Sequence, residues 1–250
     1  MLIIGCCSKK KSGGVRRTHG LFDDYLLGRY RDALMLSLST NAGMWTYQQR
    51  RAQRAPEKNL AIGRRNNAEV MPAIKRYDGI FYQRLDALNG GLRTWLAGNN
   101  GGLPDVYIIS ALYGVIESSD EIADYDLMMT DTCRDPACLQ VFGFTRNAVS
   151  VRLLWRQAFT RVYGNNPLAG PVPYSLGFLS DDYCPASGPW RHHVSARREC
   201  VKVANGNTRH TLIRWADVFN AGVGGGCVTA ANWHNLVGQP PWHGISLQGC

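Results

Sequence analysis

The segment VYIISALYG at residues 106–114 constrains the fold more than any other part of the chain. It is a short run of apolar, β-branched and aromatic residues that ends at a glycine, which is typical of a strand buried on both faces. A second run, MLIIGCCS at the amino terminus, predicts another strand, ended by the turn KKKSGG. Strands of this kind belong to α/β proteins, in which helices cover the sheet.

Helical spacing appears between these strands and after them. Apolar residues recur at three- and four-residue steps from residue 21 to residue 38, which predicts an amphipathic helix. The same spacing predicts helices at residues 80–88, 151–162 and 212–219. We therefore expect residues 1–250 to form a single compact α/β domain, with a mixed or mostly parallel central sheet flanked by helices. The Gly-, Pro- and Trp-rich segment 221–250 is expected to be irregular.

Composition indicates a cytoplasmic protein that does not enter a membrane. Apolar residues make up 45% of the chain, and none of their runs approaches the about 18 residues of a membrane span. The amino-terminal apolar run precedes its lysines, the reverse of a secretory signal. The eight cysteines contain no CxxC pair and the six histidines no metal-ligand spacing, so we expect reduced thiols and neither a metal nor another cofactor.

Basic residues gather in two segments of a chain whose net charge is +9. Residues 41–75 and 185–215 mix arginines with tryptophan, tyrosine or histidine, a combination that suits a surface holding phosphates while bases stack on flat rings. Each segment alone is also what a solvated face looks like, but two of them favour DNA as the partner. The candidate DNA-binding residues are Arg50, Arg51, Arg54, Arg64, Arg65, Arg191, Arg197 and Arg198.

An acidic segment interrupts this basic chain directly after the strand at residues 106–114. Residues 117–135 hold seven carboxylates against the single Arg134, at the place where an open α/β sheet binds its ligands. Crowded carboxylates next to a sugar can stabilise an oxocarbenium-like transition state, and their repulsion raises one pKa so that one acid can donate a proton. A Mg²⁺ or Ca²⁺ site and a solvated loop that balances the basic segments are the alternatives. The candidate catalytic residues are Asp126, Glu117 and Asp120.

Two further features predict contacts with a nucleotide. Tyrosines surround the acidic segment, and a phenol ring can both stack on an extruded base and donate a hydrogen bond, although most buried tyrosines only fill a core. The turn after the first strand presents a serine and lysines that can grip a phosphate or a carboxylate. The candidate substrate-binding residues are Ser8, Lys9, Lys10, Asp78, Tyr82, Ser110, Tyr113 and Tyr125.

Four blocks together resemble a known family. IIGCCSKKK at the start, RYDGIFYQRLDA at 76–87, SALYGVIESSDEIADYDLMM at 110–129 and FLSDDYCPA at 178–186 are similar, in this order, to blocks of the YaaA-like peroxide-stress proteins and their shorter relatives. The resemblance implies an α/β fold with a positively charged cleft, association with DNA and a role in limiting DNA damage, and some relatives are linked to base modification or excision. It marks Ser8, Lys9, Asp78, Gly79, Tyr82, Ser110, Tyr113, Gly114, Glu117, Asp120, Tyr125 and Asp126.

The chain departs from this family pattern at two positions. Asp124 stands where many relatives have proline, and Glu117 stands where longer members have arginine. Both differences add negative charge, which argues against simple DNA binding and favours a carboxylate-assisted reaction on a sugar.

These observations predict a DNA glycosylase that removes a modified base, such as a hypermodified base of foreign DNA, in repair or antiviral defence. Asp126 or Glu117 would stabilise the sugar cation or orient water, Tyr82 and Tyr113 would sandwich the base, and Lys9 would meet a phosphate. The substrate is duplex DNA with an extruded base or single-stranded DNA, and the sequence leaves the oligomeric state open. The alternatives are a non-catalytic DNA-binding protein that protects against oxidative damage, an enzyme acting on free nucleotides, and a metal-dependent nuclease.

Overall fold

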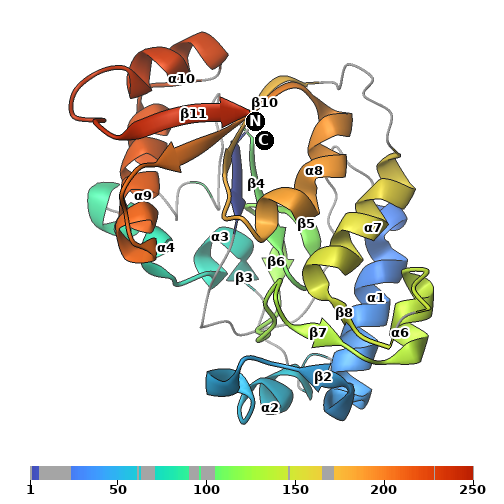
Figure 1. The fold of residues 1–250 in the computed structure, drawn as a ribbon. Coiled ribbons are helices and arrows are strands. Elements are labelled where there is room, and N and C mark those ends of the chain that lie inside the picture. Colours follow the sequence, from blue (N-terminus) through green and yellow to red (C-terminus); the bar gives the residue numbers. More distant parts are fainter. Residues whose placement is uncertain are drawn as a thin grey trace.

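The computed structural model of the protein combines helices with one large and two small sheets (Figure 1). It describes residues 2–5, 24–60, 62, 71–89, 96, 105–145, 147–164, 172–227 and 229–249. The large sheet has six strands in the order β11-β10-β9-β1-β4-β5. Their bounds are Leu2–Gly5 for β1, Val106–Ser110 for β4, Gly114–Glu117 for β5, Val172–Phe178 for β9, Ser195–Val203 for β10 and Ile245–Gly249 for β11. The expected mixture of helices and strands is confirmed.

Both strand directions occur in the large sheet. Strand β1 lies between β4 and β9 and pairs with both in parallel, and β9 pairs in parallel with β10. Strands β5 and β11, at the two outer edges, pair antiparallel with β4 and β10. The carboxyl ends of β1, β4, β9 and β10 therefore lie at the same end of the sheet.

Helices cover the two faces of this sheet (Figure 1). Rings from α4, α9 and α10 pack against Phe178 of β9, at centroid distances of 5.5–6.3 Å. On the other face, Trp190 of α8 packs against Tyr107 of β4 at 5.7 Å, and α7 packs beside α8. Tyr107 and Gly177 both pair in register with Ile3, so they lie on the same face of the sheet. Phe178 follows Gly177 and therefore points to the opposite face. The helices are α1 Asp24–Thr40, α4 Ile80–Asn89, α7 Val151–Tyr163, α8 Tyr183–Val194, α9 Thr208–Gly224 and α10 Ala230–Val237.

Two small sheets and several short helices accompany the large sheet. A three-stranded sheet joins β2 (Trp45–Thr46), β7 (Thr132–Cys133) and β8 (Val149–Ser150). A two-stranded sheet joins β3 (Met71–Pro72) and β6 (Glu121–Ile122). The short helices are η1 Ala42–Met44, η2 Gln49–Arg51, α2 Ala55–Leu60, α3 Ala73–Arg76 and α6 Pro136–Val141.

The segment at residues 106–114 is a strand and a tight turn rather than one long strand. Strand β4 ends at Ser110, and Gly114 starts β5 with a φ of +73°, a backbone conformation that side chains with a Cβ rarely adopt. The absence of a Cβ also admits Trp155, whose ring would lie 2.7 Å from that atom. The Trp155 Nε1–H donates to the carbonyl of Ala111 at 2.8 Å, which fixes the turn against α7.

Two expectations from the sequence need correction. Segment 221–250 is not irregular, because it contains the end of α9, helix α10 and strand β11, held by Trp233 in the core and by pairing with β10. Cys133, Cys138, Cys184 and Cys227 are free thiols, but Cys200 is disulfide-bonded, so the expectation of reduced cysteines throughout is wrong at that position. Spacing along the chain carries no signal for such a bond, which depends on where the fold brings the two sulfurs. Among the helices in the described ranges, none is both long enough and apolar enough to cross a membrane.

Candidate functional site

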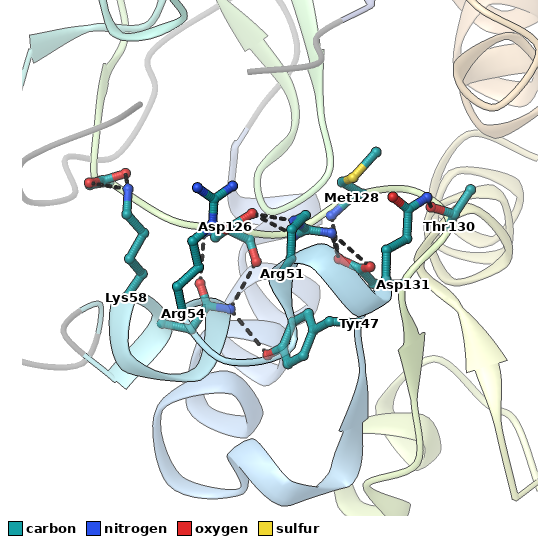
Figure 2. A network of polar contacts seen from close by, with 11 residues as sticks. Tyr47, Arg51, Arg54, Lys58, Asp126, Met128, Thr130 and Asp131 are labelled. Atoms are coloured by element: carbon teal, nitrogen blue, oxygen red, sulfur yellow. Dashed lines mark hydrogen bonds and ion pairs between the residues drawn. The ribbon is translucent and has the colours of Figure 1, made fainter. Parts of the chain in front are cut away.

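The acidic segment follows β5 and folds back against η2 and α2 (Figure 2). Residues 123–128 form no regular structure, yet most of them are buried. Backbone groups there bind side chains instead of other strands: Asn59 accepts from the Asp126 N–H at 2.9 Å and donates to the Asp126 carbonyl at 3.0 Å. Its side chain also donates to the hydroxyl of Tyr47 at 3.1 Å. Asn59 thus supplies the backbone of Asp126 with the hydrogen bonds that a neighbouring strand would supply in a sheet.

Arg51 is the centre of the network in Figure 2. Its guanidinium donates to Asp126 Oδ1 at 2.6 Å and to both carboxylate oxygens of Asp131 at 2.9 Å. The three side chains are only 8%, 7% and 0% exposed. Burial favours the neutral form of Arg51, but the hydrogen bond to Asp126 and the charge of Asp131 outweigh it, so the pKa of Arg51 is raised.

The ionisation of Asp131 follows from its contacts. Burial raises the pKa of this carboxyl group, whereas the Arg51 charge and the Met128 N–H, which donates at 2.7 Å, act in the opposite direction. The pKa of Asp131 is raised overall, because burial outweighs these contacts. The contacts themselves are three hydrogen bonds from Arg51 Nη1 and the Met128 N–H, which is the geometry of a buried salt bridge.

Arg54 and Lys58 form further ion pairs with carboxylates of the acidic segment. Arg54 Nε lies 3.3 Å from Asp126 Oδ2, and Lys58 Nζ lies 2.9 Å from Asp124 Oδ2. Arg54 keeps 47% of its side chain exposed, so it can also contact a partner in solution. The first basic segment and the acidic segment are therefore partners of each other, a pairing between residues far apart in the sequence.

Asp126 consequently sits between two guanidiniums. Its geometry suits an electrostatic or positioning role better than that of a general acid.

Glu117 and Asp120 form a separate carboxylate pair at the end of β5. Asp120 Oδ2 accepts from the Glu117 N–H at 2.6 Å. Burial, with a contribution from the Glu117 charge, raises the pKa of Asp120 to about 6, although the Glu117 N–H and the charge of Arg31 oppose the shift. Asp120 is thus a carboxyl group that retains a proton closer to neutral pH than an ordinary aspartate does.

Arg31 supports this pair from α1. Its Nε donates to the Tyr113 carbonyl at 2.6 Å and its Nη2 to the Val115 carbonyl at 2.9 Å. Burial lowers the pKa of Arg31 to about 10, and the charge of Asp120 is the largest influence against that shift. The sequence analysis missed Arg31, although Arg31 follows Leu27 by four residues and precedes Leu34 by three, which places it on the apolar stripe of the helix.

A chain of hydroxyl groups joins Ser110, Tyr125 and Tyr77. The Tyr125 hydroxyl is 2.8 Å from that of Tyr77 and 2.7 Å from Ser110 Oγ. Ser110 Oγ also accepts from the Leu112 and Tyr113 N–H groups at the turn after β4. All of these side chains are buried, so the chain connects the carboxyl end of β4 with α3 through the interior.

The two tyrosines expected to sandwich a base do not face each other in the structure. Tyr82 stacks on Tyr77 at a centroid distance of 5.7 Å, and Tyr113 packs edge to face with Tyr125 at 5.6 Å. The Tyr113 hydroxyl accepts from the Ala123 N–H at 3.0 Å, which ties the acidic segment to the turn. Both rings are at most 2% exposed and belong to the core in this conformation.

The other candidate residues are scattered. Asp78 is partly exposed, and both its carbonyl and its Oδ1 accept from Gln83. Arg197 pairs with Glu199 at 2.7 Å and is half exposed, whereas Arg191 is 1% exposed and does not reach the surface. Ser8, Lys9, Lys10, Arg64 and Arg65 lie outside the described residues, as does the side chain of Arg50.

The acidic segment does not have the arrangement of a metal site. In the part of the chain that the structure describes, no three His, Cys, Asp or Glu side chains are placed to hold one ion. Arginine and lysine cations already occupy the oxygens of Asp124, Asp126 and Asp131 that a hard cation would need.

The fold and the site together define an α/β protein with a pair of carboxylates beside a buried network of ion pairs. The chain belongs to the YaaA peroxide stress protein family, because the family model described as Peroxide stress protein YaaA matches residues 8–158, more than half of its length. The match includes the acidic segment, the first basic segment and Arg31, but the block at 178–186 lies beyond it. No curated protein matches the chain.

Proposed function

We propose that the protein is a DNA glycosylase that cleaves the N-glycosidic bond of a modified base. The observation that carries the proposal is the raised pKa of Asp120, about 6, next to a second carboxylate. Hydrolysis of a glycosidic bond uses such a pair, one group that is protonated and one that is charged, since the leaving group takes up a proton while positive charge develops on the sugar.

In this proposal Asp120 protonates the leaving base, and Glu117 stabilises the sugar cation or orients the attacking water. Asp126 fixes the acidic segment through Arg51 and Arg54. Because Tyr82 and Tyr113 are packed in the core, a base is received only after one of these rings moves. A modified base suits such a site, since an extruded base that pairs poorly costs less to remove from the duplex.

The proposed DNA surface consists of arginines that keep a free edge towards solvent. Arg54 and Arg197 are about half exposed while they hold a carboxylate, so they can reach phosphates. The proposal includes a positively charged cleft and a cytoplasmic location, where the protein would meet damaged or foreign DNA in repair or antiviral defence.

The test measures bases released from DNA. Purified protein is incubated with genomic DNA from several sources, including phage DNA with hypermodified bases, and the small molecules are identified by mass spectrometry while abasic sites are counted by alkaline cleavage. We expect Asp120→Asn to lower the rate of release about 100-fold or more, with DNA affinity unchanged. Asp181→Asn is the matched control, because Asp181 is exposed and follows β9, at the end of the sheet opposite to the one where Glu117 pairs with Tyr107.

The second candidate is a non-catalytic DNA-binding protein that protects DNA from oxidative damage. The pairing of Asp124, Asp126 and Asp131 with arginine and lysine favours it, because this pairing stabilises the fold without any substrate. Binding to every DNA tested with no release of base by the wild-type protein would support this candidate and reject the glycosylase. Strand breaks that disappear in chelator would instead indicate a nuclease, and turnover of free nucleotides without duplex affinity a nucleotide enzyme.

A further inference from the structure

A second group of basic side chains lies on the opposite side of the protein's large sheet from α4 and α9. Arg191, in the last turn of α8, is 1% exposed and points at β9 and β10. Its Nη1 lies 3.2 Å from the position that a Cβ would take at Gly177, so this glycine admits the guanidinium to the sheet. Arg198 and Ser175 pair in register on β10 and β9, and Ser175 shares the face of Gly177 because it lies two residues before it.

The partners of Arg191 are all uncharged. Its Nη1 donates to Cys200 Sγ at 3.1 Å and its Nη2 to the Glu199 carbonyl at 2.9 Å, and the free cysteine Cys184 also interacts with its side chain. Cys200 is disulfide-bonded, so its sulfur does not ionise and supplies no negative charge. Within the described residues, the Nε of Arg191 has no hydrogen-bond partner, and the side chain forms no ion pair.

Two neighbouring polar atoms, Arg198 Nε and Ser175 Oγ, are also buried without a hydrogen-bond partner among the described residues. Arg198 donates through Nη1 to the Ser195 carbonyl at 2.8 Å, but its buried Nε has no hydrogen-bond partner in the described structure. Ser175 is fully buried, and its Oγ is also without a partner there. The Nε groups of Arg191 and Arg198 and the Oγ of Ser175 are therefore buried without a hydrogen-bond partner among the described residues. This is unusual, because buried polar groups are nearly always hydrogen-bonded.

The electrostatics of the cluster are one-sided. Burial lowers the pKa of Arg191 to about 10, the charge of Arg198 adds to the shift, and the groups that oppose it are Cys184 and Tyr174, not a carboxylate. Burial, together with the charges of Arg198 and Arg191, also lowers the pKa of His192. By contrast, two other buried arginines have an acid nearby: Arg51 contacts two aspartates, and Arg31 lies within the influence of the Asp120 charge.

We propose that Arg191, Arg198 and Ser175 form a binding site for a small phosphate-type oxyanion between α8 and strands β9 and β10. Guanidinium N–H groups and a hydroxyl are the donors that recognise phosphate, and the anion supplies the charge that the cluster lacks. The ligand is a free phosphate or the phosphate of a free monoester and not the backbone of duplex DNA, because Arg191 lies beneath the surface. Arg198 is only partly buried and provides the approach from solvent. This site is independent of the proposed glycosylase reaction.

Thermal unfolding of the purified full-length protein tests the site with inorganic phosphate as the probe. At constant ionic strength, with chloride replaced by phosphate, we expect a saturable rise of the Tm of about 5 °C in the wild type, because a ligand that binds only the folded state stabilises it. Arg198→Gln and Ser175→Ala should abolish or reduce this rise. Arg209→Gln is the matched control and should keep it, because Arg209 is exposed on α9 with no contact to the cluster.

Each outcome of this experiment either supports or overturns the proposed phosphate site. Equal rises in the wild type, Arg198→Gln and Arg209→Gln would overturn the proposal, and so would a wild-type response no larger than that to chloride. A nucleoside monophosphate that competes with phosphate, while a DNA duplex does not, would identify the ligand as a free monoester. Competition by duplex DNA would overturn the assignment to a small ligand. Because no step of this experiment measures base release, its result is independent of the test of the glycosylase.

Discussion

Arg51 and Asp131 meet through two N–H···O bonds of 2.9 Å in the interior, although 80 residues separate them in the sequence. This pair, with Asp126, joins the first basic segment to the acidic segment. The excess of negative charge after β5 is therefore largely neutralised by the fold itself. Asp120 and Glu117, on which the proposed chemistry depends, are not part of this network.

Removal of the Arg51 guanidinium should destabilise the protein strongly. Arg51→Met leaves two buried carboxylates without their main partner, and we expect a loss of about 3–5 kcal/mol in the free energy of unfolding. Arg54→Gln, at a half-exposed partner of the same Asp126, should cost about 1 kcal/mol or less. Urea denaturation measures both, and equal losses in the two variants would contradict a central role of Arg51.

The stability of the folded protein should depend on pH through Asp120. Its pKa in the folded protein is about 6 against an ordinary value of 3.8, so the folded state holds more protons than the unfolded state between these pH values. The contribution of this group to stability is therefore present at low pH and is lost as the pH rises through about 6.

The measurement compares the wild type with Asp120→Asn from pH 4 to pH 7 by urea denaturation. The difference in unfolding free energy, wild type minus variant, should fall as the pH rises, because the asparagine does not titrate. If Asp120 is also the proton donor, base release by the wild type should decline above pH 6. A difference that stays constant over this range would show that Asp120 has an ordinary pKa.

The turn between β4 and β5 should tolerate no side chain at Gly114. Gly114→Ala introduces a positive φ for alanine, at about 1–2 kcal/mol, and brings a Cβ to 2.7 Å from the buried Trp155 ring. Gly143→Ala is the control, since Gly143 has a similar φ of +77° but its Cβ would meet only the flexible end of the exposed Arg161. We expect a clearly larger loss in urea denaturation for Gly114→Ala, and equal losses would mean that Trp155 is free to move aside.

The Tyr125 hydroxyl should contribute to stability through its two contacts. Tyr125→Phe keeps the ring but removes the group that Tyr77 and Ser110 contact at 2.8 and 2.7 Å, and we expect a cost of about 1–3 kcal/mol. Tyr30→Phe is a comparison on α1, where the hydroxyl accepts from the partly exposed Arg29 and should matter less. Denaturation curves that coincide for Tyr125→Phe and the wild type would show that water replaces the lost hydroxyl.

Local patterns in the sequence predicted the elements better than the contacts between them. The strand at β4, the amphipathic helix at α1 and the helix at α7 follow from residue spacing, which acts over a few positions. The regular structure after residue 221 was missed because its glycines and prolines resemble a loop, whereas pairing of β11 with β10 and burial of Trp233 depend on distant residues. Tertiary contacts override composition there.

The acidic segment is visible in the sequence, but the pairing of its carboxylates was not predicted. Crowding of carboxylates is visible in one segment, while the cations that neutralise Asp126 and Asp131 come from a segment near residue 51. The burial of Arg191 was equally hidden, because an arginine next to two histidines has the pattern of an exposed basic surface. Only the three-dimensional arrangement shows which charges meet.

The position of β1 in the sheet has a consequence for synthesis on the ribosome. Leu2 pairs with Val106 on one side and Leu176 on the other, so β1 can complete its pairing only after residue 176 has been translated. Sheets with such distant pairings form slowly, and an apolar strand without neighbours is prone to associate with other chains. The order of the strands therefore leaves β1 unpaired for most of translation, whatever the stability of the finished protein.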